Sequence, residues 1–183
     1  MSGQLSVFSA PPTRIFGDRT AHATLRSYRL GDWQAMYALD LICFAPVFQF
    51  SRGAMRGFAE GPGAVTVLAE AQRELTETQR ELANSESELA GFCLTQLDER
   101  TGYVVTLDVA PAWRRSGLAR RLMAEVESKL HSAGAVQMEL HVFTGNAEAI
   151  RFYQSIGYSQ TSIAENFYAQ GLNALLYRKQ LPA

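Results

Sequence analysis

The chain has 183 residues, of which 47% are hydrophobic and 19% are charged, as is ordinary for one globular domain. Its formal net charge of −1 excludes a global electrostatic attraction to nucleic acid or to an anionic membrane surface. Any anion site must therefore come from a local arrangement of residues. No segment approaches the length of a membrane span, and Met1–Pro12 lacks the features of a signal peptide.

Two cysteines, Cys43 and Cys93, lie in apolar stretches without metal-ligand spacing. We interpret them as buried free thiols, which favours a reducing compartment and a cytoplasmic location. The three histidines are scattered at 22, 131 and 141, so no metal site is expected.

The N-terminal part predicts a tail followed by a strand and a helix. Residues 1–23 contain two adjacent prolines and are expected to be a flexible tail. Thr24–Leu30 is a candidate strand, and Asp32 has the residue type of an N-cap for a helix over 33–43. Pro46 either ends that helix or opens a short second one.

A strand pair with a polar insertion is predicted next. Gly61–Gly63 marks a turn, after which Ala64–Ala69 and Leu89–Leu97 are expected to pair as strands. Between them, Gln72–Glu88 is rich in Glu, Gln, Thr and Ser. This segment is either a solvated insertion or a short exposed helix, and no chemistry is assigned to it.

The C-terminal half alternates strands and helices. Tyr103–Val109 and Ala135–Val142 show strand periodicity, and an amphipathic helix begins at Gly117 and ends before Gly134. Further elements are a helix capped by Asn146 and running through Ser155, and a final strand pair at Tyr158–Ala164 and Asn173–Gln180. This order predicts an α/β (α+β) fold, with helices covering a mixed sheet.

The loop between the Tyr103–Val109 strand and the long helix has the features of an anion site. Arg114 and Arg115 supply positive charge, and the helix start presents free backbone N–H groups. Gly117 has no Cβ and Ala119 is small, so a phosphate can approach the backbone closely. These features suit a pyrophosphate. The alternative is an ordinary strand–loop–helix turn with solvated arginines.

Two motifs then give the chain a resemblance to a known family. Arg114-x-x-Gly117-x-Ala119 is similar to the pyrophosphate loop of the GNAT superfamily of N-acetyltransferases. Asn146-Ala-x-Ala-Ile-x-Phe-Tyr153-x-x-x-Gly157-Tyr158 is similar to that family's fourth conserved block. The resemblance covers about residues 24–180. It implies a GNAT domain over 24–183 with a mixed, mostly antiparallel central sheet, a splayed parallel strand pair and flanking helices.

The resemblance implies acetyl-CoA as co-substrate and no metal. Tyr153 is expected to be the general acid for the departing thiolate; the alternative is a core aromatic on the buried stripe of its helix. The residues expected to bind the cofactor are Leu107, Asp108, Val109, Arg114, Arg115, Ser116, Gly117, Leu118, Ala119, Arg120, Asn146 and Tyr153.

A narrower resemblance rests on the loop Arg114–Gly117, the strand end Leu140-His141-Val142, the element Phe44-Ala-Pro46-Val47, and Phe167-Tyr168, where Phe replaces the first of a tyrosine pair. These features are similar to those of protein N-terminal acetyltransferases of the ribosomal-protein type. This resemblance implies that Tyr103 and His141 hold a water that relays the proton from the substrate amine, whose pKa is about 8. It also implies substrate contacts from Phe44, Pro46, Val47 and Tyr168. For each residue a plain alternative stays open: a half-exposed strand histidine, core aromatics, or a tyrosine that covers the sheet edge.

The predicted function is direct transfer of an acetyl group to a primary amine, with a protein or peptide N-terminal α-amine as the favoured acceptor. One alternative is a GNAT enzyme acting on a small-molecule amine. Another is a non-catalytic domain that senses acyl-CoA. No nucleic acid or membrane partner is expected, and the protein is predicted to be a monomer or homodimer.

Overall fold

The computed structural model describes residues 23–72 and 87–182. They form one seven-stranded sheet with the strand order β1-β2-β3-β4-β5-β7-β6. The neighbours β4 and β5 are parallel, and the other neighbouring pairs are antiparallel. The prediction of a mixed, mostly antiparallel sheet is therefore confirmed.

The expected tail and the polar insertion lie outside the described residues, apart from their edges. Ala23 belongs to the first strand, and Gln72, Ser87 and Glu88 belong to the strands on either side of the insertion.

The predicted helices and strands occur in the predicted order among the elements of the structure, with some shifts at their ends. They are β1 (Ala23–Ser27), α1 (Trp33–Cys43), η2 (Pro46–Phe48), α2 (Arg52–Glu60), β2 (Ala64–Gln72), β3 (Ser87–Asp98), β4 (Thr101–Val109), η3 (Pro111–Trp113), α4 (Leu118–Ser132), β5 (Gln137–Phe143), α5 (Ala147–Ser155), β6 (Ser159–Ala169) and β7 (Leu172–Gln180).

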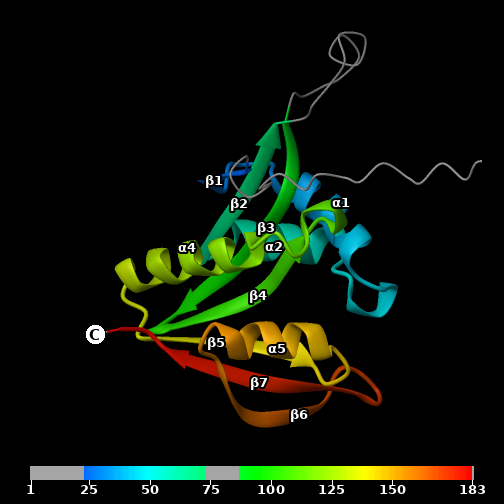
Figure 1. Cartoon of the computed structure of the whole chain (residues 1–183), viewed down its shortest axis with the longest axis vertical. Coiled ribbons are helices and arrows are strands. Elements are labelled where there is room, and N and C mark those ends of the chain that lie inside the picture. Colours follow the sequence, from blue (N-terminus) through cyan, green and yellow to red (C-terminus); the bar gives the residue numbers. More distant parts are fainter. Residues whose placement is uncertain (1–22, 73–86, 183) are drawn as a thin grey trace, which may run out of the picture.

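The helices cover both faces of the sheet (Figure 1). On one face α4 packs on β2, β3 and β4, and on the other α1 and α2 pack on the same central strands. The α4 side forms the larger hydrophobic cluster, and the α1–α2 side forms a second cluster that includes Met36, Met55 and Phe92. Two packed layers therefore hold β4 between them, which makes it a rigid base for a site.

The long helix α4 has the buried apolar stripe that its sequence predicts. Its predicted stripe, which consists of Leu118, Leu122, Met123, Val126 and Leu130, is fully buried. The helix begins after Gly117, and Gly134 follows it with a φ of 102°. A left-handed residue just beyond a helix end is the place where glycine is favoured.

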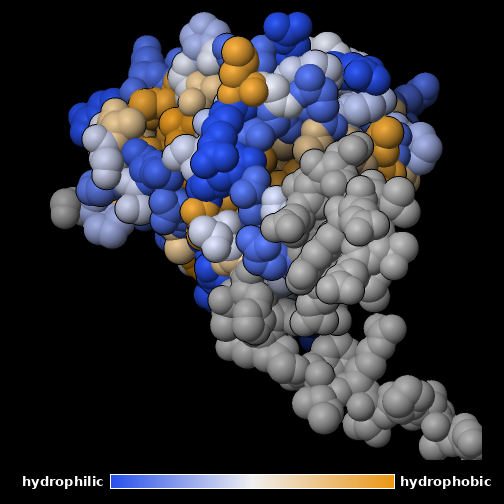
Figure 2. All heavy atoms as spheres, turned by 90° about the horizontal axis from the view of Figure 1, so that it is seen from above, coloured by the Kyte–Doolittle hydropathy of each residue, from blue (hydrophilic) through white to orange (hydrophobic). Residues whose placement is uncertain are grey.

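Many of the apolar residues in the described segments are buried. From above the view of Figure 1, the coloured part of the surface is mainly hydrophilic, and its hydrophobic residues lie in separate groups (Figure 2). Across residues 23–72 and 87–182, no helix is both long and apolar enough to cross a membrane.

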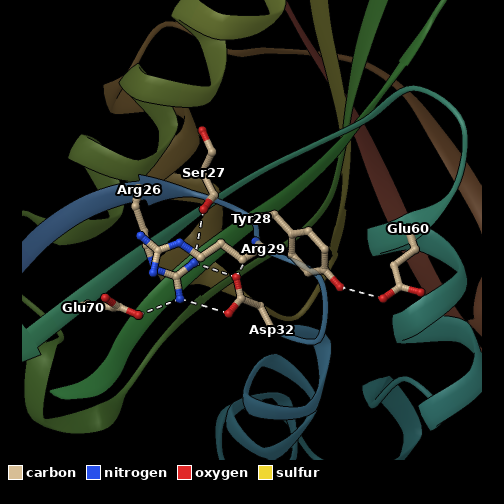
Figure 3. Close-up of polar contacts among 7 residues, drawn as sticks. All are labelled: Arg26, Ser27, Tyr28, Arg29, Asp32, Glu60 and Glu70. Carbon is tan, nitrogen blue, oxygen red and sulfur yellow. Dashed lines mark hydrogen bonds and ion pairs between the residues drawn. The ribbon is translucent and has the colours of Figure 1, made fainter. Parts of the chain in front are cut away.

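Asp32 occupies the predicted N-cap position of α1, but its side chain makes no capping hydrogen bond to the helix. It instead binds the Arg26 guanidinium at 2.6 Å and accepts a hydrogen bond from the Arg29 backbone N–H (Figure 3). Arg26 also binds Glu70 on β2, and Tyr28 donates to Glu60 on α2. This network ties β1 to α1, β2 and α2.

Helix α2 has no counterpart among the predicted elements. Its interior contains Gly53 and Gly57, and glycine is a poor helix former. The helix is stabilised by the Ser51 hydroxyl, which accepts from the Ala54 N–H at 3.1 Å, and by burial of Met55 and Ala59. The second alternative for Pro46 is confirmed, because it opens the short helix η2.

Candidate active site

The parallel strands β4 and β5 separate to form a V. They pair only where Thr101–Val104 lies beside Gln137–Leu140, and beyond that point the described residues show no further pairing between them. Figure 1 shows β4 and β5 diverging away from this common end. The predicted splayed pair is therefore present. Leu107, Asp108 and Val109 lie on the open arm of β4.

The loop after β4 has an unusual backbone. Arg115 has a φ of 62° and Gly117 a φ of 85°, so two of three consecutive residues are left-handed. The Ser116 hydroxyl donates to the Trp113 carbonyl at 2.6 Å, and Nε of Arg114 donates to the Val109 carbonyl at 3.2 Å. Successive N–H groups in such a turn can form a concave nest, which is a geometry suited to an anion, and this one lies at the start of α4.

A cavity of about 700 Å³ lies between this loop, the open arm of β4 and helix α5. Four arginines and one glutamate line it, so its charged side chains sum to a positive value. Its loop side includes Gly117, Leu118 and Ala119, and its floor includes Leu107 and Val109. Asn146 and Tyr153 form part of the α5 side. A long anionic ligand with a narrow apolar arm fits this combination of charge and shape.

Most of the residues predicted to bind the cofactor line this cavity. Asp108 and Ser116 do not. The Asp108 side chain is fully buried, accepts a hydrogen bond from the Thr106 hydroxyl at 2.5 Å, and has a pKa well above its usual range because of that burial. Its side chain is therefore not available to a ligand. The Asn146 side chain caps α5 by accepting from the Ala149 N–H at 3.1 Å, as its sequence position predicts.

A second cavity of about 190 Å³ adjoins the first. The two cavities share five residues, Phe44, Leu107, Asn146, Ala149 and Tyr153. Tyr153 is 8% exposed, and burial raises its pKa well above that of free tyrosine. Its hydroxyl has no hydrogen-bond partner in the described part of the chain. A protonated hydroxyl with a free donor thus stands where the cavities meet.

Aromatic side chains from three elements enclose the second cavity. Phe48 of η2 packs 5.1 Å from Phe143 of β5 and 5.0 Å from Tyr168 of β6, measured between ring centroids. The Tyr168 hydroxyl donates to the His141 carbonyl at 3.3 Å, and burial raises its pKa to about 12. Of the residues predicted to contact the substrate, Phe44 and Tyr168 line this cavity, whereas Pro46 and Val47 line neither.

His141 and Tyr103 lie together near the vertex of the V. The Tyr103 hydroxyl oxygen is 2.9 Å from Nδ1 of His141, and Phe167 stacks on the imidazole at 4.1 Å. Burial lowers the pKa of His141, against an opposing effect of Glu139, and burial raises the pKa of Tyr103 to about 12. At neutral pH the imidazole is therefore uncharged and able to accept a proton. His141 lines the second cavity and Tyr103 does not.

Several lining residues are not among the individually predicted site residues. Trp113 and Arg151 line the first cavity, and Phe48, Phe50 and Phe143 line the second. Phe48 and Phe50 lie in the aromatic segment 44–50, whose composition is the one signal that points to them. Across the described residues, no group of His, Cys, Asp or Glu side chains is arranged to hold a metal ion.

The sequence profile described as the acetyltransferase (GNAT) family matches residues 33–158. The chain therefore belongs to the GNAT acetyltransferase family. Its fold is similar to the crystal structure of the ribosomal-protein-S18-alanine N-acetyltransferase from Escherichia coli, with a TM-score of 0.72 at 22% identity over 88% of this chain and 95% of that one. The structure of nourseothricin acetyltransferase is also similar, with a TM-score of 0.65 at 21% identity over 88% and 99%.

In sequence, the chain is 38% identical over 86 residues to the ribosomal protein bS18-alanine N-acetyltransferase of Salmonella typhimurium. That match covers 45% of this chain and 57% of the relative. The chain thus spans little more than half the length of this curated relative. Two solved structures with the same fold are named for different acceptors, so the fold alone does not identify the acceptor.

Proposed function

We propose that this protein transfers an acetyl group from acetyl-CoA to the α-amine at the N-terminus of a protein. The observation that carries the proposal is the position of Tyr153, which lines both the first cavity, with its arginines, and the second cavity, with its aromatic side chains. One cavity is suited to the acetyl donor and the other to the acceptor. The reacting atoms meet at the residues that the two cavities share.

The groups that line the first cavity match the parts of acetyl-CoA. The pyrophosphate would lie against the nest at Arg115–Gly117, with the guanidinium of Arg114 beside it. The pantetheine arm would follow the open edge of β4 at Leu107–Val109, which has no β5 partner among the described residues. Bound there, acetyl-CoA supplies an activated acetyl group as a thioester.

The chain's own residues handle the protons. Transfer forms a bond from the amine nitrogen to the acetyl carbon and breaks the bond from that carbon to sulfur. The Tyr153 hydroxyl gives its proton to the departing thiolate, and its raised pKa keeps that proton in place until then. His141, paired with Tyr103, takes the amine proton directly or through a water. Backbone N–H groups of the β4 arm polarise the thioester carbonyl.

The lining of the second cavity favours a protein N-terminus over a small polycation. Within the described residues it is lined by no Asp, Glu, Lys or Arg, and its polar groups are neutral. A polyamine or an aminoglycoside needs carboxylates to balance its charge. An α-amine that is neutral when it reacts needs no carboxylate beside it. The aromatic lining of Phe48, Phe50 and Phe143 favours a substrate whose first residue has an apolar side chain. The bS18-alanine N-acetyltransferase named above is a relative with this class of acceptor.

A non-catalytic sensor of acyl-CoA is the less favoured alternative. A sensor needs the first cavity alone, whereas this chain also holds an acceptor cavity with a neutral imidazole and an unpartnered tyrosine hydroxyl. We place the reaction in the cytoplasm, in keeping with the two free cysteines, Cys43 and Cys93.

The test is an acceptor panel with purified protein and acetyl-CoA, monitored by release of free thiol. Peptides with a free N-terminus are expected to react, most rapidly when the first residue is apolar. Peptides with a blocked N-terminus are expected to be inert, and so are polyamines and aminoglycosides. Turnover of the small amines alone would overturn the protein acceptor and leave the acetyltransferase chemistry in place.

A further inference from the structure

One guanidinium on the wall of the first cavity has no partner in the described part of the chain. Three of the four cavity arginines are engaged: Arg114 donates to the Val109 carbonyl, Arg115 lies 3.9 Å from Glu148, and Arg120 donates to Ser155. Arg151 lines the same cavity, is exposed, and makes no hydrogen bond or ion pair with a described residue. A free cation in a ligand cavity is available for an anionic part of the ligand.

Helix geometry places Arg151 opposite the loop. Glu148, Arg151 and Ser155 are spaced by three and four residues on α5, so they share one face of that helix. Glu148 lies beside Arg115, and the Ser155 hydroxyl accepts a hydrogen bond from Arg120 at the start of α4. Arg151 lies between these two contacts, on the α5 wall of the cavity. The nest at Arg115–Gly117 forms the facing wall.

We propose that Arg151 binds the 3′-phosphate of coenzyme A, and so selects coenzyme A over its 3′-dephospho form. This inference rests on the proposed function. The pyrophosphate already has the loop N–H groups and Arg114, of which only Nε is engaged with the Val109 carbonyl. The 3′-phosphate is a separate monoester, with a charge of about −1.5 to −2 if it titrates as other phosphomonoesters do. An arginine binds such a group through two parallel N–H donors.

Arg151 lies on the α5 wall, which faces the nest across the cavity, so it is placed to contact a phosphate other than the one in the nest. A cation that merely raised the general positive potential would strengthen binding of every anionic form of the ligand. A guanidinium in contact with one phosphate strengthens only the form that carries that phosphate. The difference between coenzyme A and 3′-dephospho-coenzyme A isolates this contact, because both carry the pyrophosphate and the pantetheine arm.

The experiment is isothermal titration calorimetry of the full chain with coenzyme A and with 3′-dephospho-coenzyme A. The unchanged protein is expected to bind coenzyme A about tenfold more tightly than the dephospho form. In Arg151→Gln the affinity for coenzyme A is expected to fall about tenfold, and the affinity for the dephospho form is expected to stay the same. Arg151→Lys should restore part of the difference.

The matched control is Arg100→Gln, which removes an exposed arginine from the turn at the opposite end of β4. It is expected to leave both affinities unchanged. Equal loss of both affinities in Arg151→Gln, or no loss of either, would overturn the role of Arg151 and leave acetyl transfer untouched. If the unchanged protein binds neither ligand, the proposed function fails together with this inference. Calorimetry requires no acceptor, so these outcomes are separable.

Discussion

The hydroxyl oxygen of Tyr103 lies 2.9 Å from Nδ1 of His141, across the last paired residues of β4 and β5. This contact fixes the imidazole at the vertex of the V, where Phe167 stacks on its other side. The histidine is thus oriented from two directions before any substrate binds. An oriented, uncharged imidazole is suited to accept a proton at neutral pH.

The pH dependence of the reaction tests His141. Because burial lowers its pKa below 6.5, it gains a charge only in more acidic solution, while an α-amine titrates at about 8. We expect kcat/KM to rise with pH in two steps, a lower one from His141 and an upper one from the amine. In His141→Gln the lower step should vanish and the rate should fall about 10² fold. Initial rates from about pH 5.5 to 9 measure this. An unchanged profile in that variant would assign the proton transfer elsewhere.

Tyr153→Phe tests the general acid. Removing one hydroxyl from the residue that both cavities share should lower kcat about 10² fold, because the thiolate then leaves without a proton. The Kd of coenzyme A should change less than about twofold, since the hydroxyl donates only as the sulfur departs. Tyr37→Phe makes the same change outside both cavities and should have no effect. A kcat within about threefold of the unchanged enzyme would remove Tyr153 from the mechanism.

Gly117 and Gly134 form a matched pair at the two ends of α4. Both have positive φ, at 85° and 102°, and a Cβ on Gly134 would meet open space. Alanine at either position should cost about 1 kcal/mol of unfolding free energy. Only Gly117→Ala should also weaken coenzyme A binding, by about tenfold, because Gly117 lines the first cavity and belongs to the proposed phosphate nest. Thermal unfolding and calorimetry check the two effects. Equal affinities in the two variants would mean that the phosphate does not approach Gly117.

The ion pair of Asp32 with Arg26 should contribute to stability at neutral pH. Burial raises the pKa of Asp32, but the hydrogen bonds from Arg26 and the Arg29 backbone outweigh it, so the net pKa is lowered. A lowered folded-state pKa gives stability that is present above the unfolded value of about 3.9 and is lost as the pH falls through the folded value. Asp32→Asn should lose about 1–3 kcal/mol at pH 7, and the loss should shrink below about pH 4. Asp98→Asn, at an exposed position, is the control for urea unfolding. A loss that does not depend on pH would assign the effect to packing.

The sequence predicts those parts of the fold whose signals are local. The buried stripe of α4 repeats along the helix, and the glycine after the helix marks its end, so the helix could be placed within a few residues. The alternation of polar and apolar residues in β5 likewise predicts that Met138, Leu140 and Val142 lie on its buried face. The loop at 114–119 could be found because charge, glycine and a helix start are adjacent in sequence.

Features that depend on residues far apart in sequence could not be predicted in the same way. Asp32 has the residue type and position of a helix cap, but Arg26 on the preceding strand competes for its carboxylate. Phe48 and Phe143 face each other only because η2 and β5 meet in the folded chain. Arg151 has the pattern of any exposed residue on an amphipathic helix. Its place in the cavity follows from how α5 lies against the loop.

The most direct test uses a single peptide that has an apolar first residue, a free N-terminus and one internal lysine. Incubation with acetyl-CoA and the protein, followed by fragmentation mass spectrometry, locates the acetyl group. We predict one acetyl group on the α-amine and none on the lysine side chain, because the neutral, aromatic second cavity lacks a carboxylate for a cationic side chain. Acetylation of the lysine with the α-amine left free would contradict the proposed acceptor.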